Sequence, residues 1–129
     1  MNDFLTVGEL SRLTGLSTHA IRFYETKGVL RPASRAPNGH RRYNHADVQW
    51  LEFVLRLKRT GMPLAEIRDY AEQRAAGDVS LQTRMQMLEQ HQDRLKARIA
   101  ELSACVHLLD EKMKTYRRAL LKQKRKAGK

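Results

Sequence analysis

Residues 20–48 are AIRFYETKGVLRPASRAPNGHRRYNHADV, a stretch that predicts a helix, a glycine stop, a basic hairpin and the start of another helix. Just before it, Ser17 and Thr18 can cap the first of these helices, and Gly28 favours the left-handed conformation that ends one. From Arg12 to Arg42 the chain has seven Lys or Arg residues and a single acid. This concentration of positive charge suits the binding of phosphate.

A short helix is predicted upstream, because Thr6 and Glu9 have the spacing of a capping box and Gly15 can end the helix. The two helices would form a helix-turn-helix unit. Their apolar faces are expected to pack together through Leu10, Leu13, Ile21 and Tyr24.

The basic hairpin is predicted over Arg31 to Tyr43. Pro32 and Pro37 disfavour a helix there, and Asn38-Gly39 is a dipeptide typical of a tight hairpin turn. The hairpin would form a wing beside the helix-turn-helix unit.

Two further helices complete a winged head that we place at residues 1–77. Asn44 and Asp47 can begin the first of them through a cap and an acid in the first turn. Pro63 suits the first turn of the second, which Gly77 ends.

The chain after the head has the apolar periodicity of a coiled coil, which we place at residues 78–120. From Leu81, apolar residues recur in alternating steps of four and three, interrupted only by Gln92. A helix of about 60 Å would overhang the head, so its natural partner is a second copy of the chain. A helix folded back on its own head is the alternative, and periodicity does not decide between parallel and antiparallel pairing. The expected dimer contacts are Leu88, Leu95, Ile99, Leu102, Val106, Leu109, Met113 and Tyr116.

Residues 121–129 form a basic segment that we expect to be disordered. After Glu111 the chain contains no acid, while nine Lys or Arg residues follow. A solvating tail and a nonspecific DNA-binding arm are the two interpretations of this segment.

The composition favours a polyanion as partner. The chain has 129 residues, a formal net charge of +11 and a pI of about 10.3. The sequence contains no secretion signal and no apolar run long enough to span a membrane, so we expect a cytoplasmic protein without membrane contact. Catalytic motifs are lacking as well, which argues against an enzyme, and we expect no cofactor and no metal.

The sequence resembles the MerR family of bacterial transcriptional regulators. The resemblance is carried by TVGELSRLTGLSTHAIRFYETKGVLRP (residues 6–32), NGHRRY (38–43) and TGMPLAEI (60–67), and it extends over essentially the whole chain. It implies a mainly α-helical fold, with a winged helix-turn-helix head and a long dimerisation helix that forms an antiparallel coiled coil. It also implies a homodimer that binds double-stranded DNA at a pseudo-palindromic promoter operator and distorts it so that RNA polymerase can engage.

The expected DNA contacts come from the second helix, the wing and the end of the third helix. Arg22 is the strongest candidate, because a guanidinium can bind guanine or phosphate through two hydrogen bonds. A surface ion pair with Glu25 or Glu9 is the alternative for Arg22, and Phe23 is expected in the core. The full set is Ser17, Thr18, His19, Arg22, Tyr24, Arg35, Asn38, His40, Arg41, Arg42, Tyr43, Lys58 and Arg59.

Within the family, the segment from Trp50 to Glu72 is similar to short members associated with aldehyde or electrophile stress. Members that sense through a thiol carry a cysteine in the third helix, whereas this chain has none from Val48 to Leu57. Metal-sensing members use two or more cysteines, and the only cysteine here is Cys105. Sensing of a metal by thiolates is therefore disfavoured.

Cys105 is nevertheless the candidate residue for sensing a small-molecule or electrophile effector. It flanks the apolar face of the long helix, where it is either a small filler or a reactive thiol whose modification perturbs the dimer. A metal site shared with His107 is not expected, because residues two apart on a helix point in different directions. A small pocket lined by Trp50, Phe53, Tyr70 and His91 is a second hypothesis, although such spacing is typical of a core.

An architectural or excision-type protein that bends DNA without sensing an effector is the alternative function. The same winged head would serve it, while the long self-complementary helix argues against it. An effector-dependent change in promoter output separates the two functions.

Overall fold

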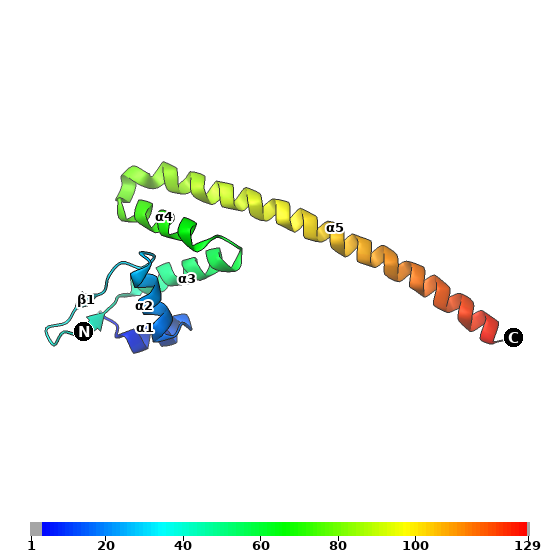
Figure 1. The fold of residues 1–129 in the computed structure, drawn as a ribbon, viewed down its shortest axis with the longest axis horizontal. Helices are drawn as coiled ribbons and strands as arrows, with labels where there is room; N and C mark the ends of the chain where they lie inside the picture. The colour runs from blue at the N-terminus through cyan, green and yellow to red at the C-terminus, as the bar shows by residue number, and fades with distance from the viewer. Residues whose placement is uncertain (1–3, 129) are drawn as a thin grey trace. The chain divides into compact units, whose positions relative to one another are not determined.

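The computed structural model describes residues 4–128, which belong to two compact units, one ending at Leu88 and one beginning at Glu89. The mainly helical fold with a two-stranded wing and a long C-terminal helix is confirmed (Figure 1). In chain order the elements are α1 (Val7–Thr14), α2 (Thr18–Thr26), β1 (Ser34–Arg35), β2 (Arg41–Arg42), α3 (His45–Arg59), α4 (Leu64–Ala75), the 3-10 helix η1 (Gly77–Ser80) and α5 (Leu81–Ala127).

The helix-turn-helix unit begins and ends at the residues that the capping pattern predicts. The Thr6 hydroxyl accepts from the Glu9 N–H and the Glu9 carboxylate accepts from the Thr6 N–H, both at 3.1 Å. Gly15 ends α1 at φ 76°, a conformation that glycine adopts without a steric penalty. Ser17 then caps α2 by accepting from the Ala20 N–H at 3.0 Å.

The core of the head draws side chains from α1 to α4. Leu10 and Ile21 are fully enclosed, as expected, but Leu13 is 53% exposed. An eight-residue helix covers only a narrow stripe of its neighbours, and Leu10 is the one buried residue of α1. The larger helices contribute Trp50, Leu51, Val54, Leu57, Ile67 and Tyr70.

The wing is an antiparallel pair of strands in which Ser34 lies opposite Arg42 and Arg35 opposite Arg41. At its tip the Gly39 N–H donates to the Ala36 carbonyl at 2.8 Å, and Gly39 has φ 84°. The predicted hairpin with Asn38-Gly39 in its turn is therefore confirmed.

Helix α3 begins with a second capping box, in which Asn44 and Asp47 exchange side-chain-to-backbone hydrogen bonds of 3.0 Å. Pro63 is the residue just before α4. The chain then forms η1, which the sequence pattern did not predict; the buried Ser80 in η1 accepts from Arg84 Nε at 3.0 Å.

Helix α5 is a single helix of 47 residues. Leu121 to Ala127 are helical, which differs from the disorder expected for residues 121–129; Lys129 itself lies outside the described residues. Two physical reasons favour the helix: the segment consists mostly of good helix formers, and cations near a helix C-terminus interact favourably with its dipole.

The apolar seam of α5 is exposed along most of the second unit. The exposed fractions range from 47% for Met113 to 66% for Val106. Leu88 differs from the rest because it packs against the core of the head, and Leu95 is half-buried. Among residues 4–128, no helix has the length and apolarity needed to cross a membrane.

Candidate nucleic-acid interface

A basic concave surface of about 480 Å³ is formed by α1, α2 and the wing. Its charged side chains are the guanidinium groups of Arg22, Arg35 and Arg41, with the His40 ring beside them. Thr6 and Val7, at the N-terminus of α1, and Gly39, at the tip of the wing, complete the lining, which among residues 4–128 holds no carboxylate. The arrangement suits an anion, because the positive end of a helix and the guanidinium groups line the same hollow.

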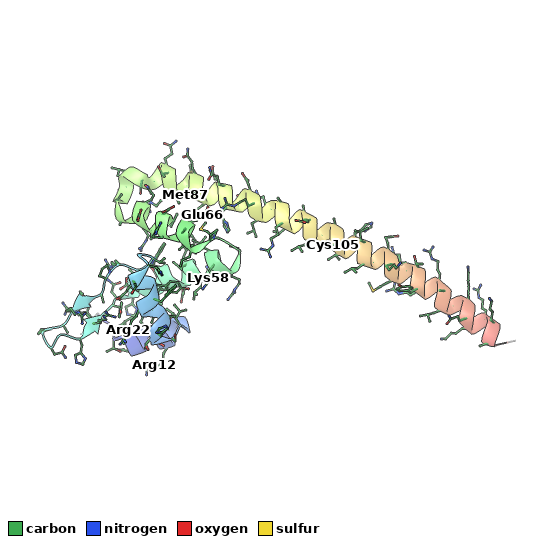
Figure 2. The ribbon with its side chains drawn as sticks, viewed as in Figure 1. Arg12, Arg22, Lys58, Glu66, Met87 and Cys105 are labelled. Carbon is green, nitrogen blue, oxygen red and sulfur yellow. The ribbon has the colours of Figure 1, made fainter. Side chains whose placement is uncertain are left out.

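The outer face of α2 presents the residues that the sequence predicted to contact DNA. Thr18, His19 and Arg22 are exposed, while the Ser17 hydroxyl serves as the cap of the helix. Figure 2 labels Arg22 on α2 and Lys58 near the end of α3. Within residues 4–128 the Arg22 guanidinium forms no ion pair, so it remains available to an incoming anion.

The carboxylate of Glu25 joins the wing to α2. The Tyr43 hydroxyl donates to Glu25 Oε1 at 2.5 Å, and Arg41 Nη1 lies 3.5 Å from Glu25 Oε2. The Glu25 side chain is only 10% exposed. Burial is the main reason that the pKa of Tyr43 is raised, and the hydrogen bond to Glu25 raises it further. The Tyr43 hydroxyl therefore stays protonated and donates at neutral pH.

Two tyrosines among the expected DNA contacts are buried, which for Tyr24 agrees with its expected packing against α1. Tyr24 is 3% exposed and its hydroxyl accepts from Lys58 Nζ at 3.3 Å, while Tyr43 is 2% exposed. Phe23, expected in the core, is 41% exposed. The reason is helical geometry: Phe23 lies two residues after the buried Ile21, about 200° around α2.

The remaining wing cations, Arg35 and Arg42, make contacts within the head. Arg35 Nη1 donates to the Gly39 carbonyl at 2.9 Å, and the Arg42 guanidinium lies 4.0 Å from the centroid of the Phe4 ring. His40 is exposed, and Asn38, also exposed, accepts from its backbone N–H. Lys58 and Arg59 are exposed at the end of α3.

The aromatic residues considered for a small pocket form a cluster in the head. The rings of Trp50 and Tyr70 are stacked with centroids 5.9 Å apart, and Phe53 contacts both. Trp50 Nε1 donates to the Val29 carbonyl at 2.8 Å, which satisfies its only donor. This packing is that of a core; His91, on α5, is also buried.

Cys105 carries a free, exposed thiol on α5 (Figure 2). In the part of the chain that the structure describes, no three His, Cys, Asp or Glu side chains gather as a metal site would require.

Sequence reasoning missed four residues of this region. Thr6, Val7 and Gly39 line the concave surface, and Glu25 binds the wing. The capping box at Thr6 already indicated where the first amides of α1 lie, but nothing local indicated that Glu25 meets a tyrosine 18 residues away.

We expect the Tyr43→Phe substitution to destabilise the head by about 1.5–3 kcal/mol, because it removes a hydrogen bond to a charged, largely buried partner. A lower denaturant midpoint with an unchanged slope would be the result. Tyr116→Phe is the matched control, since it removes the same atom from a side chain that is 56% exposed. Equal midpoints for the two variants would contradict a role of the Tyr43–Glu25 contact in stability.

Comparison with known proteins places this architecture in a family. The model of MerR HTH family regulatory proteins matches residues 5–74, and a second model, "MerR, DNA binding", matches residues 48–112. The chain belongs to the MerR family. An uncharacterized HTH-type transcriptional regulator of Haemophilus influenzae is 34% identical over 114 residues, which are 88% of this chain and 84% of that protein.

Solved MerR structures share the fold. The crystal structure of HiNmlR, a MerR family regulator lacking the sensor domain, was determined bound to promoter DNA; it is 34% identical, with a TM-score of 0.77 over 90% of this chain and 92% of that chain. A MerR family transcriptional regulator from Listeria monocytogenes is 29% identical, with a TM-score of 0.81 over 87% of this chain and 85% of that chain. The MerR family consists of non-enzymatic transcriptional regulators, which agrees with the sequence expectation.

Proposed function

We propose that this MerR family member binds a pseudo-palindromic promoter operator as a homodimer and distorts the DNA to control transcription by RNA polymerase in response to a signal. The observation that carries the proposal is the concave basic surface, where Arg22 has no ion pair among residues 4–128 and lies beside the exposed start of α2. The relative HiNmlR, bound to promoter DNA, supports the choice of ligand. Promoter DNA would place the protein in the cytoplasm of a bacterium.

The exposed seam of α5 supports dimerisation through a coiled coil. Solvent-exposed residues such as Ile99, Leu102 and Leu109 recur at coiled-coil spacing, and each would become buried in a pair of helices. Burial of one such side chain contributes about 1.5–3 kcal/mol. Repetition along the seam therefore favours a stable dimer.

Charge supports an antiparallel arrangement of the two helices. Lys112 and Arg117, the cations directly beside the seam residues Met113 and Tyr116, would lie near their own copies in a parallel pair. In an antiparallel pair they would lie nearer the first half of the partner helix, which carries the acids Glu89 and Asp93 as well as cations such as Arg84 and Arg94. The antiparallel pair also separates the two heads, as binding to two half-sites requires.

Distortion of the operator is the proposed means of control. Two heads joined through one coiled coil would bind successive grooves with the duplex in the matching bend and twist. Such deformation costs about 1–6 kcal/mol, which the DNA contacts must offset.

Footprinting of the protein on its own upstream region, with and without candidate electrophiles, tests the proposed function. We expect protection of two half-sites, hypersensitive positions between them, and a change of promoter output with the effector. Equal affinity for operator and random duplex would contradict sequence-specific regulation. A bent site with no effector-dependent output would favour the architectural alternative.

We propose an electrophile, such as an aldehyde, as the signal, and Cys105 as the residue that senses it. The thiol is exposed and flanks the seam between Leu102 and Val106, so an adduct would lie at the edge of the dimer interface. AdhR of Bacillus subtilis, a transcriptional regulator, is 25% identical over 91 residues, which are 70% of this chain and 65% of that protein.

The Cys105→Ser substitution is expected to abolish an electrophile-dependent change of promoter output while leaving operator binding intact, because a hydroxyl at this position is a far weaker nucleophile than a thiolate. Promoter-driven reporter assays with and without an aldehyde provide the measurement. Ala104→Ser, on the neighbouring exposed position, controls for the added hydroxyl. A full response in the Cys105→Ser variant would exclude the thiol as the sensor.

A further inference from the structure

The C-terminal part of α5 carries a line of cations on one face of the helix. Arg118, Lys122 and Arg125 are spaced by four and three residues, which brings them onto the same side of an α-helix. All three are exposed, and together they line a shallow depression of about 520 Å³ with Thr115, Ala119 and Leu121. We call Arg118, Lys122 and Arg125 the basic stripe.

The basic stripe has no acid in its own segment to neutralise it. The last acids of the chain are Asp110 and Glu111, and Lys114 already lies 3.3 Å and 3.4 Å from their carboxylates. Like charges four residues apart, such as Arg118 and Lys122, weaken a helix by a few tenths of a kcal/mol. An anionic partner would relieve this repulsion.

The stripe lies away from the apolar seam. Arg118 follows the seam residue Tyr116 by two positions, and Lys122 follows Leu120 by two, which places both about 200° around the helix from the seam. A coiled coil formed through the seam would therefore leave the stripe in solvent, and the partner helix could not neutralise it.

We propose that the basic stripe binds the phosphate backbone of duplex DNA beside the operator, an inference that rests on the proposed function. The stripe is about 10 Å long, and a DNA strand rises about 3.4 Å per phosphate, so it can face about three phosphates. Contacts of this kind are independent of sequence and add affinity through counterion release. The stripe would thus extend the footprint beyond the two winged heads.

Duplex DNA fits the stripe better than a protein partner does. The stripe consists of charged side chains along a straight helix, and its depression includes only one large apolar side chain, Leu121. Protein interfaces centre on buried aromatic or aliphatic anchors, whereas contacts to the DNA backbone are made by Lys, Arg and other polar groups and need no apolar anchor.

The test compares the full-length double variant Arg118→Gln/Lys122→Gln with the matched control Lys96→Gln/Arg98→Gln. Both variants lose one Arg and one Lys from exposed positions of α5, and glutamine maintains the helix. Each is titrated with a short duplex that contains only the operator and with a longer duplex that extends past it, over a range of salt concentrations. Sedimentation equilibrium establishes that all the proteins have the same mass.

We expect the stripe variant to bind the long duplex about tenfold more weakly than wild type, with the slope of log K against log salt reduced by as much as about 3.6 per dimer. Its affinity for the short duplex should equal that of wild type, and the control should behave as wild type on both.

Equal affinity and slope of wild type and stripe variant on the long duplex would overturn the inference. Unchanged DNA binding with reduced transcription by RNA polymerase would also overturn it and assign the stripe to a protein partner. Wild-type protein that fails to bind the operator would instead refute the proposed function.

Discussion

Replacement of Leu102 by glutamate is expected to convert the proposed dimer into monomers and to weaken operator binding by at least about 100-fold. In an antiparallel pair each copy contributes its own Leu102 to the seam, so one substitution removes two apolar side chains and introduces two charges. Each lost side chain costs about 1.5–3 kcal/mol, and burial of an unpaired carboxylate costs more. A monomer then binds half-sites separately and loses the gain of about 10²–10⁴ that linkage of two binding units provides.

Sedimentation equilibrium and gel-shift titration measure the two consequences of Leu102→Glu. Leu108→Glu is the matched control, because Leu108 is 68% exposed on the same helix but lies outside the seam, two positions after Val106. A dimer mass for the Leu102→Glu variant would refute the coiled coil. A monomer mass for Leu108→Glu would show that the contact face of α5 is misassigned.

Replacement of Arg22 by alanine should remove sequence discrimination while the dimer persists. A guanidinium bound to guanine through two hydrogen bonds contributes about 1–3 kcal/mol of discrimination, so two heads together contribute about 2–6 kcal/mol. Because Arg22 is exposed and forms no ion pair within residues 4–128, its truncation should leave the denaturant midpoint nearly unchanged.

The measurement is the ratio of affinities for the operator and for a random duplex of equal length. Arg98→Ala, an exposed arginine of α5, controls for the loss of one positive charge. A wild-type ratio in the Arg22→Ala variant would exclude Arg22 from base recognition. A reduced affinity for both duplexes with an unchanged ratio would make Arg22 a backbone contact.

The sequence was sufficient for those features that depend on near neighbours. Thr6 with Glu9 and Asn44 with Asp47 exchange hydrogen bonds three residues apart, and the Asn38-Gly39 turn closes within the hairpin. Such interactions form from local geometry alone, so residue type and spacing predict them.

Contacts between distant residues were not predictable in the same way. Lys58 meets the Tyr24 hydroxyl across 34 residues, and Glu25 meets Tyr43 across 18, so two polar tips that could have faced DNA are bound inside the head. The misplacement of Phe23 had another cause: its apolar side chain suggested burial, although helical spacing from Ile21 placed it outside. Residue type outweighed periodicity in that prediction, and periodicity was the better guide.

The wing is held at its stem and bonded mainly to itself at its tip. Leu5 and Tyr43 exchange backbone hydrogen bonds of 2.7 Å and 2.8 Å, and Arg31 pairs with Asp47 at the start of α3. At the tip, Arg35 and Gly39 bond within the hairpin. Amide hydrogen exchange should therefore be slow at the stem and fast at the tip. A hairpin with a firmly bonded stem and a looser tip can adapt its tip to DNA grooves of different width. Its stem can then transmit the force from a deformed duplex to the rest of the head.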